Sequence, residues 1–84
     1  MINFTKIKND INGNPRYVCH FINLLSDAES YDQNLTINEK YDLAVMKAKK
    51  IGGRRYHNKS YGGGIVFQSY NIEETEKEIL NLIK

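Results

Sequence analysis

The sequence predicts an α+β fold of order ββαβα: a three-stranded, mainly antiparallel sheet with two helices packed on one face. A strong turn signal at residues 12–15 separates two apolar segments, and two later segments of helical periodicity each begin at a capping residue. With 84 residues, 40% of them hydrophobic, the chain should form a single domain over residues 1–84. A domain this small buries only about 60% of its unfolded surface, so a homodimer would add stability.

The first predicted unit is a β-hairpin. The sequence Asn-Gly-Asn-Pro at residues 12–15 favours a tight turn, because Asn and Gly tolerate positive φ and Pro fixes its own φ. Residues 2–9 supply spaced apolar side chains for the first strand. Residues 16–25 are apolar on both faces, which predicts a second strand that is central or covered on both sides.

Two helices follow from capping signals. Residues 26–34 are polar and acidic and predict a loop in which one helical turn can form. Thr36 and Glu39 match a capping box, and the apolar spacing that follows predicts a helix over residues 37–51, ended by a glycine pair. Asn71 caps a second helix with an acidic first turn; its buried stripe contains Ile72, Ile79, Leu80 and Ile83.

Residues 64–70 are rich in β-forming side chains and predict the third strand. Two strand orders satisfy the pattern. In one, the order is 2-1-3 and the third strand runs antiparallel to the first. In the other, the third strand lies beside the second, in parallel, through a right-handed crossover.

The charge distribution is the most unusual feature of the sequence. No Asp or Glu occurs between Leu43 and Ile72. This segment contains six of the 12 lysines and arginines: Lys47, Lys49, Lys50, Arg54, Arg55 and Lys59. The flanking segments are net acidic, so the overall charge of +2 conceals a central segment of +6. Such asymmetry indicates where an anionic partner is attracted.

The predicted binding site is the basic loop that joins the first helix to the third strand. Its members, for nucleic acid or for a partner protein, are Lys47, Lys50, Arg54, Arg55, Tyr56, His57, Lys59 and Tyr61. Guanidinium and ammonium groups bind phosphates, and tyrosines stack on bases. Two alternatives stay open: the lysines only complement the helix dipole, or acidic residues from the two ends cover the basic surface. Arg16 and Tyr17 add a cation and an aromatic whose position depends on the fold.

The sequence gives no signature of an enzyme, and we expect none. Cys19 and His20 are adjacent, so on a strand they point to opposite faces; His57 can meet either one only through the fold. One cysteine and two separated histidines do not match metal-ligand spacing. The glycines at 62–64 precede a strand, whereas phosphate-binding glycine loops open a helix. We therefore expect no metal ion and no cofactor.

Two segments carry a resemblance to known proteins. Residues 9–21, NDINGNPRYVCHF, and residues 61–71, YGGGIVFQSYN, resemble segments of small, mostly uncharacterised proteins of bacteriophages and mobile elements. The resemblance implies a protein in the cytoplasm of a bacterial host cell, which fits the single cysteine and the lack of a membrane span or signal peptide. It transfers no functional residue.

Two functions from different classes follow as hypotheses. The first is a non-enzymatic module that contacts nucleic acid or a nucleoprotein through the basic loop. The second is a phage-type inhibitor that binds a host nucleic-acid enzyme or defence nuclease, with Tyr31, Tyr56 or Tyr61 as anchors. A small hydrolase that uses His20 or His57 is the least favoured.

Overall fold

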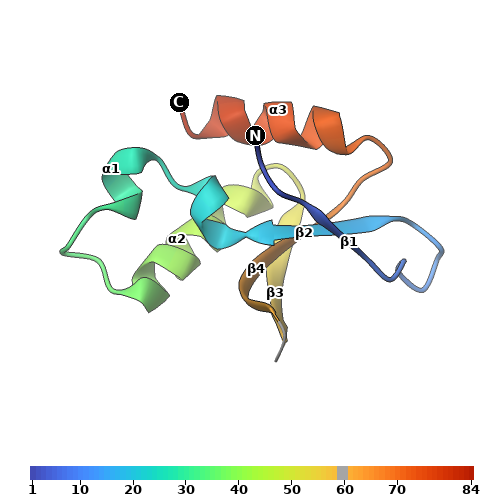
Figure 1. The fold of residues 1–84 in the computed structure, drawn as a ribbon, viewed down its shortest axis with the longest axis horizontal. Helices are drawn as coiled ribbons and strands as arrows, with labels where there is room; N and C mark the ends of the chain where they lie inside the picture. Colours follow the sequence, from blue (N-terminus) through green and yellow to red (C-terminus); the bar gives the residue numbers. More distant parts are fainter. Residues whose placement is uncertain (59–60) are drawn as a thin grey trace.

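The computed structural model describes residues 1–58 and 61–84 (Figure 1). The elements in chain order are β1 (Thr5–Ile7), β2 (Arg16–His20), a 3-10 helix η1 (Phe21–Leu24), α1 (Asp27–Ser30), α2 (Ile37–Lys49), β3 (Gly53–Asn58), β4 (Tyr61–Gln68) and α3 (Ile72–Leu82). Within these residues the strands form one antiparallel sheet in the order β1-β2-β4-β3. The α+β class is confirmed, but the described sheet has four strands, not the predicted three.

The predicted third strand is β4, and neither predicted strand order is correct. β4 lies beside β2 in antiparallel orientation, with Val18 opposite Val66 and Tyr17 opposite Phe67. The order 2-1-3 placed the third predicted strand beside the first strand, whereas β4 pairs with β2. The parallel crossover placed it beside the correct strand but in the wrong direction. The physical reason is β3: residues 53–58, predicted as a loop, form an additional strand that pairs with β4 and reverses the chain before β4 begins.

The predicted hairpin is confirmed as β1 and β2, which pair antiparallel. Gly13 takes a φ of 81° in the connection, and the Asp10 carboxylate accepts hydrogen bonds from the backbone N–H groups of Asn12 and Asn14, both at 2.9 Å. β2 ends at His20 instead of residue 25. The chain turns into η1 there, because the 3-10 turn buries Phe21 and Leu24 together in the core.

Both predicted helix starts are confirmed. In α2, the Thr36 hydroxyl accepts from the Glu39 N–H at 3.1 Å while the Glu39 carboxylate accepts from the Thr36 N–H at 3.0 Å. The helix ends two residues earlier than predicted, and Gly52 follows with a φ of 85°. In α3, the Asn71 side chain accepts from the Glu74 N–H at 3.3 Å. The acidic loop contains the short helix α1.

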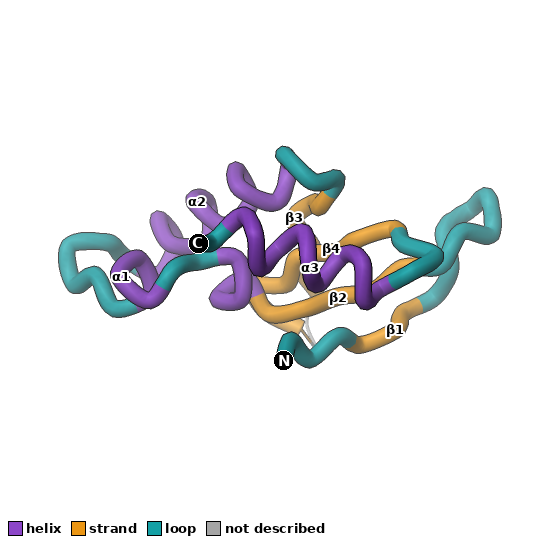
Figure 2. The backbone as a smooth tube through the Cα atoms, turned by 90° about the horizontal axis from the view of Figure 1, so that it is seen from above, coloured by secondary structure: helices purple, strands orange, loops and turns teal. Residues whose placement is uncertain are grey.

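The longer helices, α2 and α3, cover one face of the sheet. The core cluster joins residues of the sheet, η1, α2 and α3: Cys19, Phe21, Leu24, Leu25, Ala44, Val45, Ala48, Ile65, Phe67 and Ile79. Figure 2 shows α3 lying over the strands with α2 to one side. Because side chains alternate along a strand, Ile65 and Phe67 point toward the helices, and Val66 and Gln68 point to the helix-free face.

Candidate nucleic-acid interface

The middle of the acid-free segment forms β3, which is an edge strand of the sheet. Arg55 lies opposite Ile65, and Arg54 lies opposite Val66. Directly opposite residues of an antiparallel pair share a face, so Arg55 points toward α2 and Arg54 points to the helix-free face. The strand therefore divides the two adjacent arginines between the two faces of the sheet.

Arg55 is held against α2. Its Nη2 donates to the Asp42 carboxylate at 2.6 Å, and its guanidinium lies 4.4 Å from the centre of the Tyr41 ring. The Tyr41 hydroxyl lies 3.0 Å from the backbone oxygen of Tyr56 and 2.8 Å from that of Gly64. These contacts orient the guanidinium, whose side chain remains 45% exposed. A guanidinium has five N–H donors, so Arg55 can contact a phosphate while it keeps Asp42.

Lys47 has an acidic partner. Its ammonium donates a short hydrogen bond to the Glu29 carboxylate at the start of the acidic segment. This hydrogen bond is the main reason that the pKa of Glu29 lies below its ordinary value of 4.5. The pair matches the alternative in which acidic residues cover basic ones, and it offsets the charge that Lys47 would offer to a ligand.

Three other cations lie free on the surface around the end of α2. Lys49, Lys50 and Arg54 are exposed, and their side chains make no hydrogen bond or ion pair with any residue of 1–58 or 61–84. A hollow of about 540 Å³ opens here, and its lining includes Lys49, Arg54 and Arg55 beside the glycine pair. The positive side chains of Lys49, Arg54 and Arg55 thus border one concave site.

Arg16 joins this surface from β2. It lies opposite Gln68, so its side chain is on the same helix-free face as that of Arg54. The two arginines line a second hollow, of about 220 Å³, together with Asp10, Gly52, Val66 and Gln68. We call Arg16, Lys49, Lys50, Arg54 and Arg55 the cationic edge. Arg16 and Lys49 were not among the predicted site residues; the register of β2 on β4 and of β4 on β3 brings Arg16 there.

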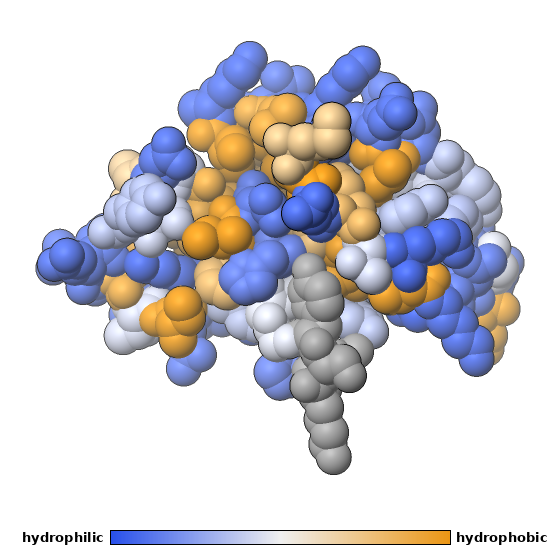
Figure 3. Space-filling model, in the orientation of Figure 1, coloured by the Kyte–Doolittle hydropathy of each residue, from blue (hydrophilic) through white to orange (hydrophobic). Residues whose placement is uncertain are grey.

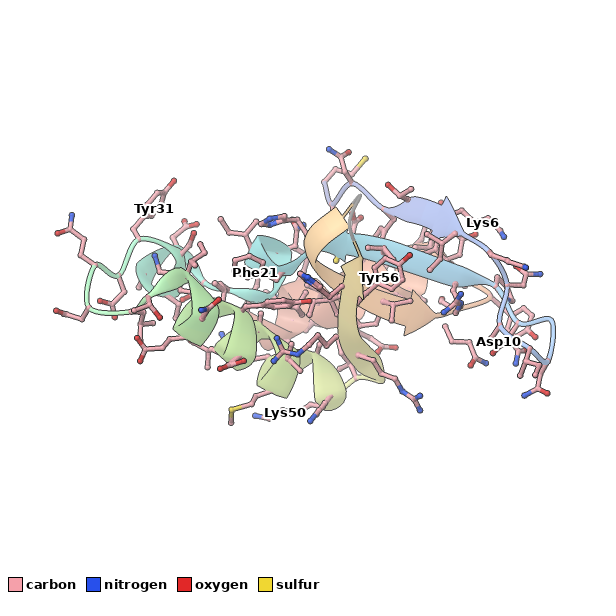
Figure 4. All side chains as sticks on the ribbon, turned by 90° about the horizontal axis from the view of Figure 1, so that it is seen from below. Lys6, Asp10, Phe21, Tyr31, Lys50 and Tyr56 are labelled. Carbon is pink, nitrogen blue, oxygen red and sulfur yellow. The ribbon has the colours of Figure 1, made fainter. Side chains whose placement is uncertain are left out.

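The other predicted site residues have different positions. Tyr56 is half-buried and extends from β3 away from α2 (Figure 4). His57 is exposed near the end of β3. Tyr61 begins β4, and Lys59 lies outside the described residues. Of the predicted site residues, Arg54 and Arg55 thus border one hollow with Lys49, Lys50 lies at the end of α2, and Tyr56 lies on the face opposite to that of Arg55.

The two histidines lie at one further hollow, of about 310 Å³. Its lining residues come from the end of β2, the start of α2 and the β3–β4 hairpin: His20, Phe21, Ile37, Asn38, Tyr41, His57, Gly62 and Gly63. Cys19 is not among them. The Cys19 side chain is fully buried in the core, and burial raises the pKa of its thiol to about 12. A thiol with that pKa is not a nucleophile at neutral pH.

Across residues 1–58 and 61–84, no three side chains of His, Cys, Asp or Glu come together to hold a metal ion. In the same part of the chain, no helix is long and apolar enough to cross a membrane.

Comparison with known proteins gives one family. The family model for the Staphylococcus phage terminal repeat-encoded protein TreK matches residues 1–84, so the chain belongs to this phage protein family. Neither a curated protein nor a solved structure matches the chain. The resemblance to phage proteins is thereby confirmed at the level of the family.

Proposed function

We propose that this phage protein is a non-enzymatic module that binds nucleic acid through the cationic edge. The observation that carries the proposal is the position of Arg54. It is exposed, has no partner among the described residues, and borders both the hollow with Lys49 and Arg55 and the hollow with Arg16. Cations that converge on one surface from separate elements suit a chain of phosphates better than a single small anion.

Two of these cations are held in place by their neighbours. Asp42 pairs with Arg55, and Asp10 lines the hollow with Arg16. Arg16 donates through Nε to the backbone oxygen of Lys8 at 2.9 Å, which fixes its side chain and leaves its other donors available. Guanidinium groups held in this way lose little conformational entropy when they bind a phosphate.

The test is the salt dependence of binding. If four of these cations contact phosphates, log K should fall against log salt with a slope of about −3.6 for duplex DNA and about −2.8 for a single strand. Affinity for a duplex would then fall roughly 100-fold between 50 and 200 mM salt. Fluorescence anisotropy with labelled 12-mers of DNA and RNA, single- and double-stranded, measures both quantities.

The decisive variant is Lys49→Glu with Arg54→Glu. Arg55 is left unchanged, because its loss would also leave Asp42 without its partner. The matched control is Lys77→Glu with Lys84→Glu, which makes the same change in net charge at exposed positions of α3 and the chain end. The double variant should lose binding and reduce the slope by about 2, while the control keeps most of both. Equal affinity of the two variants would refute the proposal.

The alternative function, a protein inhibitor of a host nucleic-acid enzyme, has a separate surface in its favour. Apolar side chains gather between the N-terminal segment and α3 (Figure 3), and a hollow of about 350 Å³ there is lined by Met1, Ile2, Phe4 and Ile72 among others. Tyr31, 80% exposed, lies at α1, away from Tyr56 on β3 (Figure 4). Capture of one host enzyme that survives nuclease treatment and the Lys49→Glu, Arg54→Glu change would favour this function.

A further inference from the structure

The hollow between the two histidines touches the cationic edge through a stack of planar groups. The His20 and Phe21 rings lie 4.6 Å apart, and the Phe21 and Tyr41 rings lie 5.1 Å apart, with tilts of 33° and 31°. The Arg55 guanidinium continues the series 4.4 Å from the Tyr41 ring centre. The faces of Phe21 and Tyr41 are covered within this series, so a ligand in this hollow would meet their edges and the rings of His20 and His57. An oriented cation stands at the end of the series.

The hollow is open because two of its lining residues are glycines. Gly63 has a φ of 76°, and a Cβ built on it would lie 2.8 Å from Phe21 Cδ1, so this backbone approaches the aromatic ring directly. A Cβ on Gly62 would meet nothing within 4 Å. The register between β3 and β4 shifts between Tyr56 and Asn58, and His57 lines the hollow together with both glycines.

Polar groups with unused hydrogen-bonding capacity also line the hollow. His20 Nδ1 accepts from the Ile22 N–H at 3.3 Å, which leaves Nε2 as the protonated nitrogen of the neutral ring. That Nε2 lies 3.9 Å from the Cβ position of Gly63. The Asn38 side-chain amide has no hydrogen-bond partner among residues 1–58 and 61–84, so it offers a donor and an acceptor. These groups match the carbonyl and amine edge of a nucleobase.

We propose that this hollow receives an unpaired base of single-stranded nucleic acid, while Arg55 contacts an adjoining phosphate. The proposal rests on the proposed function and specifies its substrate: a strand with an accessible base, in preference to a duplex. The rings of His20 and His57 suit a base because every base has a π-face, and a base in a duplex must first leave its stack and its partner. Because one base–aromatic contact contributes about 1–3 kcal/mol, we expect the affinity for a single strand to exceed that for a duplex about tenfold.

The experiment follows the ring signals of the two histidines by NMR during titration with a single-stranded 12-mer and with the matched duplex. With the single strand, the signals of His20 and His57 should shift together with that of the Arg54 side chain. With the duplex, the Arg54 signal should shift and the histidine signals should stay in place. Histidine shifts of equal size with both probes would overturn the proposal.

Gly62→Phe tests the hollow itself, because Gly62 lines it and a Cβ there would meet nothing within 4 Å. The variant should lose the single-strand preference and keep its duplex affinity. Leu80→Phe, which adds the same ring at a 46% exposed position of α3, is the matched control and should keep the preference. If circular dichroism shows that Gly62→Phe is unfolded, Asn38→Ala replaces it.

The two proposals fail in different ways. Binding to neither probe overturns the proposed function, and the base site with it. Binding to both probes with equal affinity, unchanged in Gly62→Phe, overturns the base site alone and leaves the phosphate-binding surface.

Discussion

Replacement of Gly53 by alanine should destabilise the protein, because β3 lies close to α2 at this glycine. A Cβ at position 53 would lie 2.7 Å from the Ala48 Cβ and 2.7 Å from Phe67 Cε1. Ala48 is fully buried on α2 and Phe67 is 2% exposed on β4, so neither neighbour can move into open space. The added methyl group must push the edge strand away from the core.

The magnitude follows from two opposing effects. Overpacking a core in this way costs about 1–3 kcal/mol, and two rigid neighbours place the cost near the upper end. Loss of the glycine's freedom in the unfolded chain offsets about 0.4–1 kcal/mol. The net loss should be about 2 kcal/mol, which is large beside the roughly 4–13 kcal/mol expected for a domain of this size. The midpoint of thermal unfolding should fall by about 8–16 °C.

Urea denaturation followed by far-UV circular dichroism measures this loss, with Gly62→Ala as the control. The control residue also lies in the β3–β4 hairpin, but its Cβ would meet nothing within 4 Å, so its free energy of unfolding should change by less than about 1 kcal/mol. A Gly53→Ala variant as stable as the wild type would show that α2 does not pack on β3 as described. The position of the cationic edge would then have to be reconsidered.

Three further predictions test other contacts of the site and core. Tyr41→Phe should lower the free energy of unfolding, measured by urea denaturation, by about 1–2 kcal/mol, because the carbonyls of Tyr56 and Gly64 lose the single O–H donor that they share. The pKa of Glu29 is lowered in the folded state, so the stability that it contributes is present above its ordinary pKa of 4.5 and is lost as pH falls through the folded value. Lys47→Met should therefore make the free energy of unfolding depend less on pH in that acidic range. An unchanged pH dependence would contradict the pairing of Lys47 with Glu29. Cys19 should react with a thiol reagent at neutral pH only as fast as the protein opens, so labelling as rapid as in urea would contradict its burial.

The helices and the first hairpin could be predicted because their signals are local. The Thr36 and Glu39 side chains each accept from the other's backbone N–H, three residues apart. The Asn71 side chain accepts from the Glu74 N–H in the first turn of α3. The connection around Gly13 likewise depends on neighbouring residues. Local signals of this kind can be recognised in a short stretch of sequence, without knowledge of the rest of the fold.

β3 could not be predicted, because its partner is not local and its composition is misleading. The segment GRRYHN has no β-branched residue and no apolar alternation, so charge and flanking glycines favoured a loop. It becomes a strand because it pairs with the edge of β4 that β2 leaves unpaired, and because Gly53 fits between Ala48 and Phe67. Because β3 reverses the chain before β4, it sets the direction of β4. The predicted strand order was therefore wrong for the same reason that β3 was missed.

The candidate site was predicted in part for a similar reason. The acid-free segment correctly indicated an excess of positive charge, but sequence position does not show which charges are offset in space. Lys47 reaches Glu29 across 18 residues, and Arg55 reaches Asp42 across 13. Arg16 reaches the surface only through strand register. Charge segregation along a chain therefore predicts a surface more reliably than it predicts the members of that surface.

An arginine on an edge strand has two physical uses that exposure alone does not distinguish. Charged side chains on an edge prevent pairing with another chain, and any charge of either sign serves that purpose. A phosphate site needs positive charge in particular. Arg54→Glu keeps the edge charged and reverses its sign, so a protein that uses Arg54 only to protect the edge would stay monomeric and bind as before. Loss of binding in a soluble, folded Lys49→Glu, Arg54→Glu variant would assign the cationic edge to phosphate recognition, because protection of the edge predicts no such loss.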